Sequence, residues 1–429
     1  MSDLSSKTFG VFDHYGLFTA LARRLAQSGA KVFYATPVDR RDRITDAIVG
    51  DGMPDIVCVD ELWTEKAKID CFVFPDIRHS GLQAELRSQG LPVWGSQGGM
   101  QLEQNRQFFM AKLAELGLDV PDFDEIQGVT NLGLFLKDKS DIWIKVSKWR
   151  GTWETFHWRG WEQDWHNLDQ WACLFGGIKE FVRFLCFPKI ETDLEIGADT
   201  YCVDGQWPSL MLHGIERKDQ AYFAAVTKRE DMPEQLIPVM DALSPFLQEV
   251  GYRNQWSMEN RVTKDKNYFI DATTRGGLPS TASFLKAKNT PEVIYHGAHG
   301  DFVELDYGFR FSAECMVTLK GDAKEWQTCE LTPEVKESFL AQQACEVKGQ
   351  LWYPPTDDSS NIGWLLATGQ TPKECLEQMN HLADELPDGA NAEVEALADV
   401  IREINSEQDQ GIRFTDVVLP DADIVLEES

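Results

Sequence analysis

The stretch Trp256–Ser280 reads W-S-M-E-N-R-V-T-K-D-K-N-Y-F-I-D-A-T-T-R-G-G-L-P-S, and it decides the fold. Two runs that contain apolar residues, Trp256–Val262 and Tyr268–Asp271, flank a polar, turn-prone linker. This pattern predicts a β-hairpin. The hairpin would place Glu259 on its first strand and Asp271 at the end of its second, where the two carboxylates could share divalent cations.

Arg275 follows the second strand and stands directly before the glycine pair Gly276-Gly277. Carboxylate oxygens beside a cation and a glycine turn suit the chemistry of magnesium-bound phosphate. The alternative is a surface hairpin whose charges are solvated, and the local pattern alone leaves both interpretations open.

Taken with its surroundings, the hairpin resembles the metal-binding end of ATP-grasp enzymes, in particular carboxylate–amine ligases like glycinamide ribonucleotide synthetase. The second strand of that family carries E-x-N-x-R-x-G, and the matching segment here is Asp271–Gly277. The resemblance implies that Glu259 and Asp271 are metal ligands and that Thr273 occupies the position of the family's asparagine ligand. It implies that Arg275 contacts phosphate. It also implies ATP and Mg²⁺ as cofactors, with Mn²⁺ as a substitute metal.

The resemblance extends upstream of the hairpin. The segments Gly90–Gly95 (GLPVWG) and Gln101–Arg106 (QLEQNR) are similar to the family's G-I-x-V-x-G strand and L-E-x-x-K helix. The family's phosphate-binding lysine falls on Arg106, whose guanidinium can also grip phosphate oxygens. A second lysine is expected further along at the end of a strand, and Lys145 in Ile142–Val146 supplies it. The alternative for Lys145 is a solvent-facing residue on an edge strand.

The family's glycine-rich flap corresponds to Ser147–Thr155, where Lys148 and Arg150 would add side-chain charge to the backbone contacts with phosphate. Tryptophans are dense in and after this segment. They could pack a lid or stack against a flat substrate, but core packing is expected for most of them because tryptophan is largely buried on average. These residues are Trp149, Trp153, Trp158, Trp161, Trp165 and Trp171.

The family's adenine-binding hinge corresponds to the end of an apolar, strand-like run. The resemblance places Phe187, Lys189 and Ile190 at the nucleotide and matches Glu195 with the family's glutamate after the hinge. A hairpin turn is expected at Asp204-Gly205.

Strand-like segments alternate with helical stretches near the N-terminus, which predicts a parallel α/β domain. The strands are expected at Thr8–Asp13, Lys31–Ala35, Ile56–Val59, Cys71–Phe74 and Pro92–Trp94. The first strand is not followed by G-x-G-x-x-G, which argues against a Rossmann dinucleotide site. Ligands often bind at the ends of parallel strands, and Asp13, His14, Asp76 and Arg78 are expected at two such ends.

The predicted fold class is α/β and α+β, an ATP-grasp fold in three parts. Residues 1–103 would form the N-terminal parallel α/β domain. Residues 104–310 would form the nucleotide-binding region, with its flap or lid at about 140–205. Residues 311–429 would form a small C-terminal α+β domain with an acidic tail, which includes a strand, turn and helix at Asn361–Leu376.

The composition fits a soluble enzyme. A net charge of −29 disfavours direct binding to nucleic acid. The nine cysteines contain no C-x-x-C, which argues against a disulfide framework or structural zinc and for a reducing cytoplasm. Apolar runs are too short to span a membrane, and the polar start is unlike a signal peptide.

The function implied by the resemblance is an ATP-dependent ligase that joins a carboxylate to an amine through an acyl phosphate and releases ADP and phosphate. Arg275 and Lys145 would be the catalytic residues. The partners would be small-molecule carboxylate and amine substrates, and a homodimer is compatible with this expectation. Two alternatives stay open: another ATP-grasp reaction, such as a carboxylase or a phosphotransferase, and a non-catalytic ATP-binding scaffold.

Overall fold

The structure is a computed structural model, and it describes residues 3–37, 49–148, 155–192, 194–321, 325–354, 361–415 and 419–420. The chain forms two compact units, each assembled from separate stretches of sequence. The first unit consists of residues 1–98, 197–257 and 273–429, and the second of residues 99–196 and 258–272. The three-domain division expected from the sequence stays a prediction.

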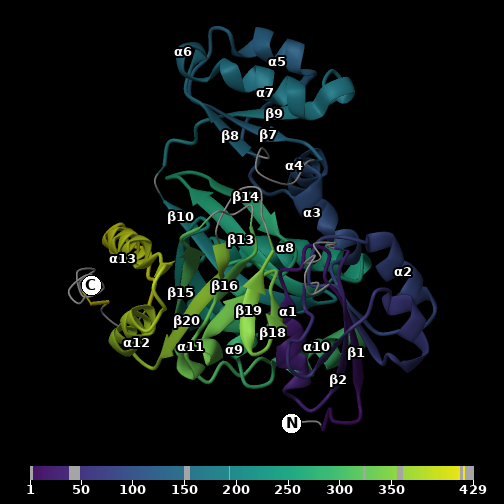
Figure 1. Cartoon of the computed structure of the whole chain (residues 1–429). Coiled ribbons are helices and arrows are strands. Elements are labelled where there is room, and N and C mark those ends of the chain that lie inside the picture. Colours follow the sequence, from purple (N-terminus) through teal and green to yellow (C-terminus); the bar gives the residue numbers. More distant parts are fainter. Residues whose placement is uncertain are drawn as a thin grey trace. The chain divides into compact units, whose positions relative to one another are not determined.

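The N-terminal sheet of the first unit is parallel, as predicted. Its strands are β1 (Thr8–Phe12), β2 (Lys31–Ala35), β3 (Ile56–Cys58), β4 (Cys71–Val73) and β5 (Val93–Trp94), in the order β3-β2-β1-β4-β5. Helices α1 (Thr19–Ala26) and α10 (Thr290–His299) cover one face (Figure 1). The 3-10 helix η1 (Leu62–Lys68) and helix α2 (Ser80–Ser88) cover the other. Burial on both faces explains why these strands are almost wholly apolar.

A larger sheet follows along the chain, in the order β14-β13-β10-β11-β12-β15-β20-β17, with β21 beside β15. Its strands are β10 (Glu195–Val203), β11 (Leu210–Arg217), β12 (Ala221–Lys228), β13 (Arg253–Val262), β14 (Asn267–Thr273), β15 (Phe311–Leu319), β17 (Phe339–Ala341), β20 (Asn361–Gly369) and β21 (Ala390–Ala392). Helices α12 (Pro372–Asp384) and α13 (Val394–Asp409) pack on β12, β15 and β20 and share one hydrophobic core with them (Figure 1).

One long helix and several short elements complete the first unit. They are α8 (Leu236–Glu249), α9 (Thr281–Lys286), α11 (Pro333–Glu337), η4 (Arg229–Asp231) and a small sheet of β16 (Gln327–Cys329), β18 (Cys345–Val347) and β19 (Gln350–Tyr353). The expected turn after β10 is present, because Asp204 and Gly205 both have positive φ, at 48° and 81°. Such φ values are typical of a tight hairpin turn.

The strand, turn and helix expected at Asn361–Leu376 are also confirmed as β20 and α12. Thr371 begins the helix with a capping box. Its hydroxyl accepts a hydrogen bond from the Glu374 backbone at 3.2 Å, and the Glu374 carboxylate accepts one from the Thr371 backbone at 3.2 Å. This reciprocal pair satisfies two backbone N–H groups at the helix end, so the sequence itself fixes where the helix starts.

The second unit contains a four-stranded antiparallel sheet in the order β6-β9-β7-β8. Its elements are η2 (Gln97–Met100, which begins in the first unit), α3 (Gln101–Gln104), α4 (Arg106–Glu115), β6 (Asp124–Gln127), α5 (Val129–Leu136), β7 (Ile142–Val146), β8 (Thr155–Trp158), α6 (Trp161–Asp164), α7 (His166–Phe175), η3 (Gly176–Ile178) and β9 (Arg183–Pro188). Helices α5 and α7 lie on one face of the sheet (Figure 1) and form a core with it.

The tryptophans of this unit divide between core and surface. Trp158 and Trp171 are fully buried in its core, as expected. Trp161 and Trp165 are 40% and 48% exposed, so core packing does not account for them. The expected flap tryptophans, Trp149 and Trp153, lie outside the described residues.

The hairpin predicted from the opening stretch is present as β13 and β14, which pair in the sheet. Its turn is closed by a hydrogen bond from the Thr263 N–H to the Lys266 carbonyl at 2.8 Å. Burial alternates along the end of β13: Met258, Asn260 and Val262 are buried, while Glu259 and Arg261 between them are half-buried. Since side chains alternate between the two faces of a strand, Glu259 and Arg261 share its more open face.

All nine cysteines are free thiols. Within the described ranges, no helix is long and apolar enough to cross a membrane.

Candidate functional site

Asp271 is the centre of the cluster that the second unit builds. Arg106 Nη1 lies 2.7 Å from Asp271 Oδ1, and Lys145 Nζ lies 3.7 Å from Asp271 Oδ2. Lys145 also donates to the Ile270 carbonyl at 3.4 Å. The structure therefore brings together three residues that the family resemblance selected, and Arg106 and Asp271 are 165 positions apart in the sequence.

Arg106 reaches Asp271 because of a break between two helices. Asn105 ends α3 in an extended conformation and caps α4, with its side chain accepting a hydrogen bond from the Phe108 N–H at 3.3 Å. Arg106 is thus the first residue of α4 and is only 2% exposed. A buried guanidinium requires a charged partner, and Asp271 provides one.

Lys145 lies on β7, which has β9 on one side and β8 on the other. It is not on an edge strand, so that alternative interpretation of Lys145 is wrong. Its side chain is 16% exposed and its neighbours Ile144 and Val146 are buried, which directs the ammonium group along the strand surface to Asp271. Two cations therefore lie at one carboxylate of the second unit.

The other two predicted acidic residues of this unit have different surroundings. Glu195 begins β10 and accepts a hydrogen bond from Arg261 Nε at 2.9 Å, so its charge is already paired. Glu259 is half-buried on β13 and shares the more open face of that strand with Arg261.

Thr273 is the last residue of β14 and Arg275 follows that strand, and both belong to the first unit. Arg275 Nε lies 3.8 Å from Asp76 Oδ1, and its Nη1 donates to the Gly276 carbonyl at 3.1 Å. Gly276 donates to the Pro75 carbonyl at 3.0 Å, and a Cβ there would lie 2.6 Å from the Phe18 ring. Only glycine permits this close approach, which packs the turn carrying Arg275 against the loop after β4.

The predicted phosphate flap is described only at its ends. Lys148 is exposed and has a positive φ of 61°, while Trp149–Glu154, which includes Arg150, lies outside the described residues.

The predicted adenine hinge lies at the end of β9. Phe187 is buried, with its ring centroid 5.5 Å from that of Phe123. Lys189 is exposed and Ile190 half-buried. The nucleotide roles of Lys148, Phe187, Lys189 and Ile190 stay predictions.

The two strand ends named from the sequence in the first unit have distinct roles. Asp13 is fully buried and holds the backbone just before α1, accepting hydrogen bonds from the Phe18 N–H and the Tyr34 hydroxyl, each at 2.7 Å. Burial raises the pKa of Asp13 to about 6, against the lowering effect of these hydrogen bonds. Asp13 is therefore a structural residue.

His14, Asp76 and Arg78 lie at the same sheet edge, as expected from the parallel order of β1 and β4.

Sequence reasoning missed two residues at this edge, Tyr15 and His79. His14 Nδ1 lies 3.0 Å from His79 Nε2, and the Tyr15 hydroxyl accepts from Arg78 Nε at 2.9 Å. Each missed residue is the sequence neighbour of one that was named. That adjacency is the only signal the sequence offers for them.

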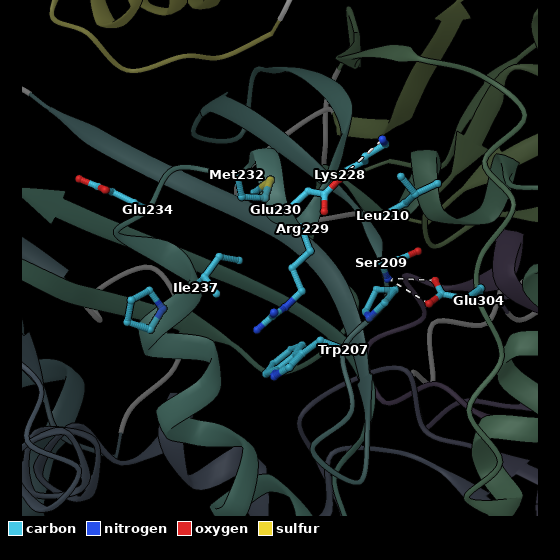
Figure 2. A pocket seen from close by; sticks show the side chains of 12 residues that line it. Trp207, Ser209, Leu210, Lys228, Arg229, Glu230, Met232, Glu234, Ile237 and Glu304 are labelled. Atoms are coloured by element: carbon cyan, nitrogen blue, oxygen red, sulfur yellow. Dashed lines mark hydrogen bonds and ion pairs between the residues drawn. The ribbon is translucent and has the colours of Figure 1, made fainter.

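A pocket of about 900 Å³ lies elsewhere in the first unit and contains none of the predicted site residues (Figure 2). Trp207 forms part of its wall, and charged side chains surround it. Several of these charges are already paired: Lys228 lies 3.7 Å from Glu230, Arg229 pairs with Asp241, and Glu304 accepts the Ser209 N–H at 3.0 Å. The pocket consequently shows no distinct ligand chemistry.

No protein-family model matches this sequence, and no curated protein matches it. Solved structures do. A phosphoribosylamine–glycine ligase from Thermotoga maritima is 15% identical in sequence to this chain and superposes on it with a TM-score of 0.65. The match covers 90% of this chain and 98% of that ligase. An L-amino acid ligase from Bacillus licheniformis is 15% identical to this chain, with a TM-score of 0.58, and the match covers 89% of this chain and 98% of that ligase.

A third structure is the biotin carboxylase domain of 2-oxoglutarate carboxylase from Hydrogenobacter thermophilus, a dimer in complex with MgADP, ADP and bicarbonate. Its identity is 13% and its TM-score 0.63, and the match covers 95% of this chain and 96% of that one. These similarities span nearly the whole of each chain, and together with the confirmed hairpin and sheets they show that this chain has the ATP-grasp fold.

Proposed function

We propose that the protein is an ATP-dependent ligase that joins a carboxylate to an amine. The observation that carries the proposal is the cluster of Arg106 and Lys145 around Asp271 on the hairpin strand. The fold supports it, because the similar solved structures include ligases and a carboxylase domain that binds MgADP.

The residues around Asp271 fit a magnesium nucleotide. Glu259 and Asp271 offer carboxylate oxygens, the hard ligands that Mg²⁺ prefers. The metal role of Thr273, which belongs to the first unit, stays a prediction. Among the described residues, no group of three or more His, Cys, Asp or Glu side chains could hold a metal alone. This agrees with the usual behaviour of Mg²⁺, which takes one or two carboxylates and completes its shell with phosphate oxygens and water. Bound there, the ion would neutralise charge on the transferring phosphoryl group.

Each residue of the cluster has a distinct task in the proposed reaction. Lys145, the more accessible cation, would hold nucleotide phosphate oxygens. Arg106, which is almost fully buried, would orient Asp271, and its predicted contact with phosphate stays a prediction. The phosphate contact of Arg275, which belongs to the first unit, stays a prediction.

In the reaction, a carboxylate oxygen would attack the γ-phosphorus of ATP while the bond to the β-phosphate oxygen breaks and ADP leaves. The amine nitrogen would then attack the acyl carbon. The C–O bond to phosphate breaks, phosphate leaves with the electron pair, and the amine loses a proton. The protein would contribute mainly positioning and electrostatic stabilisation.

The test is a screen of carboxylate and amine pools for ADP release, with mass detection of the coupled product. A ligase gives ADP only when both substrates are present, together with a product whose mass equals their sum less one water. ADP release that needs bicarbonate alone would indicate a carboxylase, and tight ATP binding without turnover in any pool would indicate a scaffold.

A further inference from the structure

The carboxyl edge of the parallel sheet carries polar groups that the proposed nucleotide chemistry does not use. Strand β1 is central: β2 and β3 continue the sheet on one side of it, and β4 and β5 on the other. The chain order thus reverses between β1 and β4, and in open parallel sheets ligands bind at such a switch point, outside the carboxyl ends of the strands. The loops that follow these two strands supply His14, Tyr15, Asp76, Arg78 and His79.

Two half-buried imidazoles meet at this edge. His14 Nδ1 and His79 Nε2 lie 3.0 Å apart, and the ring centroids are 5.0 Å apart. His79 has a positive φ of 66° at the start of α2, a conformation that is uncommon for residues other than glycine. Burial, followed by the charge of Arg78, lowers the pKa of His14. Burial, His14 and then Arg78 lower that of His79. Both effects favour the neutral imidazoles.

Asp76 is the second and independent sign of a ligand. It is 5% exposed, and its Oδ1 accepts the Ile77 N–H at 2.7 Å and lies 3.8 Å from Arg275 Nε. Its Oδ2 is buried and has no hydrogen-bond partner among the described residues. A buried carboxylate oxygen without a donor is costly, because its desolvation is not compensated. A ligand that donates a hydrogen bond to Oδ2 would remove this cost.

Arg78 supplies the opposite charge from the same loop. Its guanidinium donates to the Tyr15 hydroxyl and lies over the Tyr15 ring, 5.5 Å from the ring centroid. In the part of the chain that the structure describes, it forms no ion pair with a carboxylate. A guanidinium has five N–H donors in a planar fork, so donors remain to bind a carboxylate.

We propose that this edge binds an α-amino acid as a zwitterion, with the ammonium group at Asp76 and the carboxylate at Arg78. The inference rests on the proposed ligase function in one respect: the amino acid would be its amine substrate. Asp76 Oδ2, unpartnered among the described residues, and the donors of Arg78 favour this class over two others. A phosphate ester has no ammonium group to donate to Asp76 Oδ2, although Arg275 Nε, 3.8 Å from Oδ1, adds a second cation to this edge. A neutral polyol would leave Arg78 without an anion.

The test needs no nucleotide. Calorimetry with the full-length wild-type protein measures binding of a panel of standard L-amino acids. For any that bind, it also measures the N-acetyl derivative, which lacks the ammonium group, and the amide, which lacks the carboxylate. Each derivative is expected to bind at least about tenfold more weakly, because each loses a charge-assisted hydrogen bond.

Two variants assign the groups. Asp76→Asn should abolish the preference for the parent amino acid over its N-acetyl derivative and keep the preference over the amide. Arg78→Gln should do the reverse. Arg23→Gln on α1 and Glu85→Gln on α2 are matched controls in the same unit and should preserve both preferences.

The inference is wrong if no amino acid binds at millimolar concentration, or if the wild-type protein binds the parent and both derivatives equally. Neither result depends on a variant that folds. The ligase proposal fails separately. Amino acid binding that depends on Asp76, without ADP formation in any pool, would support the amino acid site and contradict the ligase proposal. ADP formation with an amine other than an amino acid, unchanged in Asp76→Asn, would support the ligase proposal and contradict the amino acid site.

Discussion

Asp271 lies on β14 and Asp76 in the loop after β4, and the surroundings of these two carboxylates are opposite. Asp271 is 30% exposed and faces two cations, Arg106 and Lys145. Asp76 is nearly buried, has one distant cation in Arg275, and has an oxygen with no partner among the described residues. The difference teaches how to separate two kinds of polar site. A carboxylate surrounded by cations belongs to a site that handles negative charge, whereas a buried one with an open oxygen belongs to a site that lacks a donor.

The comparison predicts that substitutions of the two aspartates change different kinetic parameters. Asp271→Asn should lower kcat for substrate-dependent ADP formation by on the order of a thousandfold, because the metal stabilises charge that develops in the transition state. Asp76→Asn should raise KM for the amine and leave kcat nearly unchanged, since it removes a binding contact. Steady-state kinetics with both substrates varied measures the two effects.

Glu259→Gln is a second variant at the proposed metal site. The double variant with Asp271→Asn should be little worse than either single one, because both residues act through the same ions. ADP formation that survives Asp271→Asn would remove the distinction between the two aspartates.

Lys145 should account for much of the nucleotide affinity. Lys145→Ala should weaken binding of ATP with magnesium at least about tenfold, since a charge-assisted hydrogen bond contributes roughly 1.5–3 kcal/mol. Calorimetry with a non-hydrolysable ATP analogue measures the loss. Lys137→Ala, at an exposed position in the same unit, is the control. Equal affinity in the wild type and Lys145→Ala would exclude the phosphate role.

A third carboxylate, Glu314, extends the comparison to a site where the described residues form no ion pair. Glu314 on β15 is fully buried and accepts the Ser283 N–H at 3.0 Å and the Ser283 hydroxyl at 2.6 Å. Burial raises the pKa of Glu314 from 4.5 to about 7. Between these values the folded state holds a proton that the unfolded state has lost. The free energy of unfolding should therefore fall as pH rises towards 7 and then level off.

The glutamine side chain of the variant Glu314→Gln does not titrate. The variant's stability relative to the wild type should increase by about 2 kcal/mol between pH 5.5 and 7, at roughly 1.4 kcal/mol per pH unit. Urea unfolding at several pH values measures the difference, and Glu337→Gln at an exposed position is the control. Parallel stability curves for the wild type and Glu314→Gln would mean that Glu314 titrates normally.

The smallest expected effect is on the stability of Asp76→Asn. Removing a buried charge with an open oxygen should change the free energy of unfolding by less than about 1 kcal/mol, or raise it, because binding sites often reduce stability. Asp271→Asn should lose about 1–3 kcal/mol, since it leaves the buried Arg106 without its anion. Urea unfolding of both variants at one pH measures the two losses of stability. A larger loss for Asp76→Asn than for Asp271→Asn would contradict the prediction.

Much of this fold could be predicted from patterns that are local in the sequence. The alternation of strands and helices predicted Lys31–Ala35 to the residue, and the turn-prone linker predicted the hairpin. The strand Ile142–Val146 came from the family resemblance. The sites were less predictable, because Arg106 meets Asp271 across 165 positions and His14 meets His79 across 65. Such pairs depend on the sheet order and the helix break at Asn105, which no local pattern encodes.

The division of the chain has a consequence for how the molecule can be made. The polypeptide passes between the two units four times, at residues 98–99, 196–197, 257–258 and 272–273. Neither unit is a continuous fragment, so neither can be expressed by simple truncation. During synthesis the second unit lacks its hairpin until residue 272 has emerged, long after its own sheet is complete. The Asp271 cluster therefore assembles late, when most of the chain has already been made.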